Sequence, residues 1–186
     1  SSGDNNYYDL IKTVLKFKKK TFISTGMTDD KDLKNLYKYI KKQKFNLSKL
    51  TLMHCVSSYP VEDIYANLNN IIYMKKNFKI NIGYSDHTLG SEASIAAVAM
   101  GACVIEKHFT LDNNFSNFRD HKISLNPVDM EKMVLSIRRV EKLIGNEKKI
   151  IQDCEKKIIP YARRSFYYSR NINKDTIIED KDLLIL

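Results

Sequence analysis

The sequence predicts an α/β fold with parallel strands, organised as half of a (β/α)8 barrel. Four short apolar, β-branched runs begin at residues 21, 50, 80 and 103, and segments with helical periodicity separate them. This spacing is typical of repeated strand–helix units, in which each helix carries the chain back to start the next parallel strand. A doubly wound sheet is the alternative architecture, but the GxGxxG phosphate-binding motif that usually accompanies it is absent.

The first half of the chain contains three of the predicted strands. A helix is predicted at "NNYYDLIKTVLKFKKK" and a strand at residues 21–25, "TFIST". The next helix is indicated by "DKDLKNLYKYIKKQK", where Leu33, Leu36, Tyr37 and Ile40 have the spacing of one helix face. Strands are then predicted at 50–55 and 80–85, with a helix at "NLNNIIYMKKNF" between them.

The second half completes the barrel portion and starts something new. A helix at "SEASIAAVAM" precedes a strand at 103–109, in which Cys103 is expected to be buried. The last helix has Pro127 in its first turn and Gly145 at its end. Residues 1–146 are therefore predicted to be a partial barrel domain, 147–163 a linker, and 164–186 the start of a small second domain.

Composition excludes several classes of protein. The net charge of +9 comes from lysines spread along amphipathic segments without a nucleic-acid motif, so no nucleic-acid partner is expected. No apolar run reaches the roughly 20 residues of a membrane span, and none is expected. Three cysteines without a CxxC pair indicate a reducing compartment, here the cytoplasm. Because the chain starts at Ser1 and stops at "DLLIL", we expect it to be a fragment of a longer protein.

Polar side chains follow each predicted strand, and a barrel would bring them together at its catalytic face. His87 and His108 end adjacent strands, which lie about 4.8 Å apart, so both imidazoles can reach one divalent metal ion. Asp86 and Glu106 are the nearby carboxylates for a third ligand, although Glu106 should point away from the face of Lys107. Hydroxyls suited to phosphate or carboxylate oxygens occur at Ser2, Ser24, Ser57 and Ser85, with helix capping or turn formation as the alternative role.

These residues closely resemble a known family, the sialic acid (N-acetylneuraminate) synthases, which include legionaminic and pseudaminic acid synthases. The resemblance rests on "GYSDHTLGSEASIAAVAMGACVIEKHFTLD", "STGM", "HCVSSYP", "DHKISL" and the opening "SSGDNNYYDLI". It implies that the four strands are strands 5–8 of the barrel. It also implies that "RRSFYYSRNINKDTIIEDKDLLIL" begins an antifreeze-like SAF domain, and that the complete protein is a homodimer.

The resemblance also implies a reaction and a set of site residues. The reaction condenses phosphoenolpyruvate with N-acetylmannosamine, its 6-phosphate or a related N-acetylated sugar, releases phosphate, and uses a divalent metal, Mn²⁺ first, with Mg²⁺ or Co²⁺ as alternatives. His87 and His108 match the metal ligands. The serines at 2, 24, 57 and 85 match positions that hold phosphoenolpyruvate, and Asp4, Tyr59 and Asp120 match positions that hold the sugar. Asp86, Lys107, Asp120 and His121 are the catalytic candidates.

Departures from the family pattern leave alternatives open. Some members have Asn at the position of Ser57, and many bacterial members have Glu at the position of Asp4. Whether the sugar is phosphorylated is therefore undecided. Two other functions remain: a TIM-barrel aldolase acting on a different phosphorylated substrate, and a non-catalytic fragment or interaction module that retains the family motifs.

Overall fold

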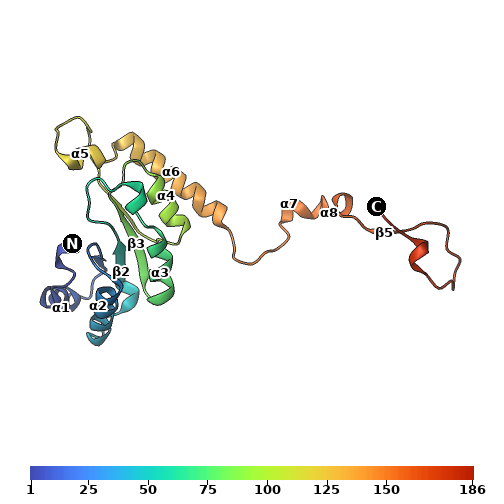
Figure 1. Ribbon diagram of the computed structural model, residues 1–186, viewed down its shortest axis with the longest axis horizontal. Helices are drawn as coiled ribbons and strands as arrows, with labels where there is room; N and C mark the ends of the chain where they lie inside the picture. Colours follow the sequence, from blue (N-terminus) through green and yellow to red (C-terminus); the bar gives the residue numbers. More distant parts are fainter. The chain divides into compact units, whose positions relative to one another are not determined.

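The computed structural model describes all of residues 1–186, which divide into two compact units, residues 1–145 and 146–186 (Figure 1). The first unit alternates helices and strands along the chain: α1 (Tyr8–Lys16), β1 (Thr21–Ser24), α2 (Asp30–Lys42), β2 (Leu50–His54), α3 (Asn69–Asn77), β3 (Asn81–Asp86), α4 (Glu92–Ala99), β4 (Ile105–Lys107), α5 (Arg119–Ile123) and α6 (Pro127–Ile144). The predicted order of strands and helices is confirmed. None of the helices combines the length and the apolar composition needed to cross a membrane.

The four strands form one parallel sheet in the order β1-β2-β3-β4. Helices cover one face of this sheet, and α3 and α4 lie alongside β3 (Figure 1). The core on that face joins strand residues to helix residues, namely Ile23, Leu50, Leu52, Ile82 and Tyr84 with Leu33, Leu36, Ile40, Ile71, Met74 and Ala97. Because successive strand residues point to opposite faces, the alternate positions form a second face, which we call the open face.

The register of the strands defines the open face row by row. Ser24 pairs with Met53, and Met53 pairs with Gly83, so these three residues form one row. Met53 lies so close to Gly83 that a Cβ atom there would approach its Cε to 2.9 Å, which explains why glycine occupies this position. Ser85 pairs with Glu106 in the next row along the strands.

Helix ends agree with simple capping chemistry. The Asp29 side chain accepts a hydrogen bond from the backbone N–H of Asp32 at the start of α2, and Asn126 caps α6 in the same way. At the other end of α6, Gly145 has a φ of +61°, as the sequence predicted for a helix-terminating glycine.

Two details of the predicted fourth strand are wrong. The strand ends at Lys107 rather than at residue 109, because Phe109 leaves the sheet to form a bridge with Leu125. Cys103 is exposed, not buried. It precedes β4, which is the last strand of the sheet and has no neighbour to cover its outer side.

The second unit contains two short helices, α7 (Asp153–Lys156) and α8 (Ile159–Ala162), and an antiparallel pair of strands, β5 (Phe166–Tyr168) and β6 (Leu183–Ile185). Asp182 is buried here and pairs with Arg170, whose Nη2 lies 2.6 Å from its Oδ1.

Candidate active site

The carboxyl ends of the four parallel strands meet at one edge of the sheet, and His87 and His108 lie there just beyond β3 and β4. Their ring centroids are 5.5 Å apart. The Tyr59 ring completes the group, with its centroid 4.2 Å from that of His87 and 5.8 Å from that of His108. The two histidines thus lie close together, as the sequence predicts.

Both imidazoles have the chemistry of metal donors. His87 Nδ1 lies 2.8 Å from the Val56 carbonyl oxygen, so this nitrogen donates the hydrogen bond and Nε2 is the nitrogen left to face a metal ion. Burial lowers the pKa of His108. The Asp120 carboxylate opposes this shift, whereas His87 adds to it. A neutral imidazole is the form that binds metal ions.

Neither Asp86 nor Glu106 supplies the expected third ligand. No group of three or more His, Cys, Asp or Glu side chains comes together to hold a metal ion. Glu106 instead accepts a hydrogen bond of 2.7 Å from the Ser85 hydroxyl, whose oxygen lies 3.5 Å from His87 Nε2. The two histidines fit a metal ion as two donors of a larger set.

Asp86 and Lys107, both predicted to be catalytic, lie away from the histidine pair. The Lys107 ammonium is 3.2 Å from Asp86 Oδ2, and the two side chains are 1% and 0% exposed. The remaining lone pairs of Asp86 accept hydrogen bonds from Thr88 and from Ser94 of α4. The pair therefore faces the helices, because strand alternation puts Asp86 on the side opposite to Ser85 and His87.

A third group of residues surrounds Tyr59. The Arg119 guanidinium carbon lies 4.9 Å from the centre of the Tyr59 ring, within the range of a cation–π interaction. Arg119 Nε is also 3.6 Å from Asp120 Oδ1, an ion-pair distance that is too long for a hydrogen bond. Asp120 Oδ1 is buried and has no hydrogen-bond partner. Sequence reasoning missed Arg119, although its position next to Asp120 was a usable signal.

The predicted serines fall into two places. Ser24 and Ser85 lie on the open face, whereas Ser2 and Ser57 meet around Gly26, whose backbone N–H donates to Ser2 Oγ at 3.1 Å. Cys55 Sγ is 3.2 Å from Ser2 Oγ. A side chain at Gly26 would collide with both serine hydroxyls, so this glycine permits their approach. We call Ser2, Cys55 and Ser57 around Gly26 the serine cluster; neither Gly26 nor Cys55 was predicted.

Two other predicted residues lie outside these groups. Asp4 accepts a hydrogen bond of 2.6 Å from Ser1, which lowers the pKa of its carboxyl group. His121 Nδ1 lies 3.0 Å from Thr110 Oγ1, and its ring is 5.3 Å from that of Phe115. Asp4 and His121 thus hold their own loops and make no contact with the histidine pair.

Comparison with known proteins identifies the family. The model of the NeuB family matches residues 1–149. The chain belongs to the NeuB family. Its relatives include N,N'-diacetyllegionaminic acid synthase of Campylobacter jejuni, which is 37% identical over 98% of this chain and 54% of that protein. Human N-acetylneuraminate-9-phosphate synthase is 36% identical over 83% of this chain and 42% of that protein.

Solved structures of related proteins are similar to the chain. The N-acetylneuraminic acid (sialic acid) synthetase of Leptospira borgpetersenii, crystallised with citrate, superposes with a TM-score of 0.79 at 35% identity, covering 86% of this chain and 55% of that one. The parallel sheet of this NeuB-family chain is accordingly a curled, half-barrel sheet. The chain spans about half the length of the relatives that it matches.

Proposed function

We propose that this NeuB-family chain forms strands 5–8, the carboxyl-terminal half, of a (β/α)8 synthase barrel. The enzyme condenses phosphoenolpyruvate with N-acetylmannosamine, its 6-phosphate or a related N-acetylated sugar, and releases phosphate. The relatives named as legionaminic acid and N-acetylneuraminate-9-phosphate synthases support a product of the sugar-acid class. The observation that carries the proposal is the group of His87, His108 and Tyr59 at the carboxyl edge of the sheet, where barrel enzymes have their active sites.

The serines are proposed to hold phosphoenolpyruvate. Hydroxyl groups bind phosphate and carboxylate oxygens without adding charge, and the serine cluster places those of Ser2 and Ser57 close to Gly26, whose own N–H orients Ser2. Ser24 and Ser85 extend this lining along the open face.

His87 and His108 are proposed to hold a divalent metal ion, Mn²⁺ first, with Mg²⁺ or Co²⁺ as alternatives. The donor set fits, because His87 is oriented by the Val56 carbonyl and burial favours neutral His108. When bound, such an ion polarises a carbonyl group as a Lewis acid.

Tyr59, Asp120 and Asp4 are proposed to bind the sugar. The buried Asp120 Oδ1 lacks a hydrogen-bond donor, and a sugar hydroxyl would supply one. Arg119 holds both Tyr59 and Asp120 in place. We assign positioning roles to Asp86 and Lys107, which fix the ends of β3 and β4, and to His121, which orders its loop.

The second unit is proposed to begin an SAF domain of a cytoplasmic homodimer. Its antiparallel pair of strands supports a separate small domain, and the ion pair between buried Asp182 and exposed Arg170 stabilises its turn.

The decisive experiment is His87→Ala in the complete protein. We expect loss of Mn²⁺ binding, measured by calorimetry, together with loss of phosphate release from phosphoenolpyruvate and an N-acetylated mannose-type sugar. Lys132→Met is the control, since Lys132 forms an exposed pair with Asp129 on α6 and lies outside the group. Unchanged metal binding in His87→Ala would refute the ligand assignment. Phosphate release without the N-acetylated sugar would favour the aldolase alternative, and its complete absence would favour a non-catalytic module.

A further inference from the structure

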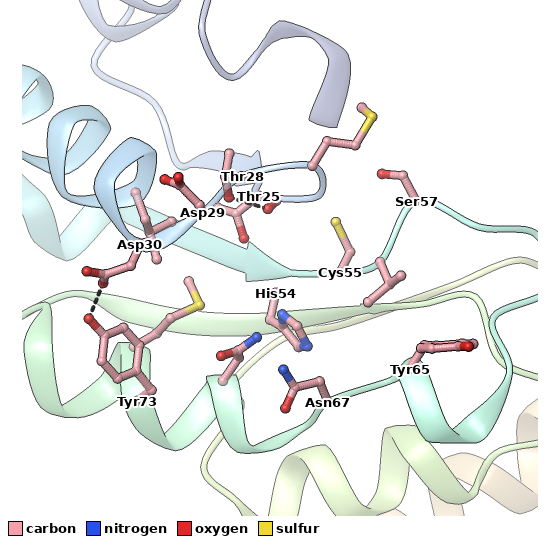
Figure 2. Close-up of a pocket in the computed structure, with 15 residues that line it drawn as sticks. Thr25, Thr28, Asp29, Asp30, His54, Cys55, Ser57, Tyr65, Asn67 and Tyr73 are labelled. Atoms are coloured by element: carbon pink, nitrogen blue, oxygen red, sulfur yellow. Dashed lines mark hydrogen bonds between the residues drawn. The ribbon is translucent and has the colours of Figure 1, made fainter.

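A polar cavity of about 530 Å³ lies next to the serine cluster. Five segments line it: residues 25–28 after β1, the amino end of α2, the end of β2 with the residues that follow it, residues 65–67, and α3 (Figure 2). Thr25, His54 and Met74 are buried and form part of its lining. Figure 2 shows Tyr73 and Asp30 joined by a hydrogen bond at one end, and Ser57 and Tyr65 at the other. Of the residues that line it, only Ser57 has a substrate-binding role proposed above.

Several polar side chains in the cavity are available to a ligand. Tyr65 and Asn70 form hydrogen bonds within the chain through their backbone N–H groups, to Glu62 and Asn67, which leaves the Tyr65 hydroxyl and the Asn70 amide free. The Asn67 amide and the Ser57 hydroxyl also face this space. Each amide offers donors and an acceptor together, an arrangement that matches neighbouring hydroxyl groups on a ring.

The charges of the cavity disfavour an anion. No lysine or arginine lines it. Its two carboxylates are already engaged, Asp29 by the backbone N–H of Asp32 at 2.8 Å and Asp30 by the Lys34 ammonium at 2.6 Å. Burial lowers the pKa of His54, which favours the uncharged form of its ring. A phosphate or carboxylate would therefore be desolvated without a cation to compensate it.

We propose that this cavity is a second ligand site, which binds a neutral sugar ring. Its volume is within the usual range for small-molecule sites, its amides suit vicinal hydroxyls, and the Tyr65 ring, 63% exposed, offers an aromatic face. Ser57 borders both this cavity and the serine cluster. Occupation of the cavity should therefore alter the binding of phosphoenolpyruvate; this coupling, unlike the binding itself, rests on the proposed function.

The test uses the complete protein and a methyl glycoside of N-acetylglucosamine, whose closed ring cannot supply the open-chain aldehyde of the proposed substrate. We expect saturation-transfer NMR to detect binding, and Asn70→Ala and Tyr65→Ala each to weaken it roughly tenfold, the effect of losing one or two good contacts. The matched control is Asn69→Ala, an exposed amide of the same helix that does not line the cavity. Circular dichroism checks that each variant is folded.

The outcomes separate this site from the catalytic one. Binding that survives His87→Ala but is weakened by Asn70→Ala supports the second site, whether or not the protein releases phosphate. Binding that disappears in His87→Ala and is unchanged in Asn70→Ala would place the glycoside at the histidine pair and overturn the proposal. Failure of the wild-type protein to bind the glycoside would overturn it as well.

Discussion

At the scale of single residues, Asp120 carries the sharpest expectation because its buried Oδ1 has no hydrogen-bond partner. Asp120→Asn replaces a charged acceptor by a weaker one and should raise the KM for the sugar about tenfold, with little change in the KM for phosphoenolpyruvate. Steady-state kinetics of the complete protein measure both constants. Asp153→Asn is the control, since its side chain is 93% exposed and lies in the other unit. An unaltered sugar KM would contradict the assignment of Asp120.

His54 predicts a pH effect on stability. Its pKa is lowered from 6.5 in the folded state because the ring is buried, so the folded protein holds its proton less tightly than the unfolded chain. The stability due to neutral His54 is fully present above about pH 6.5 and is lost as the pH falls through the folded-state pKa. Urea unfolding between pH 7.5 and 5.5 should therefore show a steeper loss in the wild type than in His54→Gln. Parallel curves would contradict the prediction.

At the scale of elements, the Asp86–Lys107 pair joins the ends of β3 and β4. Lys107→Met leaves the Asp86 carboxylate buried without its cation, and should lower the free energy of unfolding by about 3–5 kcal/mol. The matched control is Lys132→Met, because Lys132 and Asp129 form an exposed pair at 3.1 Å, and its effect should stay within about 0.5 kcal/mol. Equal effects of the two substitutions in denaturant titrations would show that the buried pair has no special structural role.

The same elements show what a sequence pattern can predict. The four strand–helix units were predictable, because β-branched runs and helical stripes such as Leu33 to Ile40 are periodic signals. The pairing of His87 with His108 followed from adjacent strand ends. The partners of each side chain were harder to assign: alternation puts Asp86 on the face opposite to Ser85, but only the strand register places Lys107 beside Asp86 and Glu106 beside Ser85. Contacts between residues far apart in the sequence, such as that of Arg119 with Tyr59, leave no periodic signal.

At the scale of the whole molecule, the open face and the outer strands β1 and β4 determine whether residues 1–186 associate with one another when expressed alone. Phe22 of β1, the first strand of the sheet, is 53% exposed on this face. Beyond β4, the aromatic side chains of Phe109, Phe115 and Phe118 are also more than half exposed. Unpaired strands beside exposed apolar surface favour association between chains.

We therefore expect residues 1–186 to self-associate, with a sedimentation coefficient that rises with protein concentration. Phe22→Lys should reduce this association, because a charged side chain on an outer strand opposes strand pairing between molecules. Tyr161→Lys is the matched control: Tyr161 is 91% exposed but lies on α8, a helix of the second unit, and is not part of a strand. A wild-type chain that sediments as a monomer at every concentration would show that the open face does not mediate association. Equal effects of the two substitutions would point to net charge rather than to the sheet as the cause.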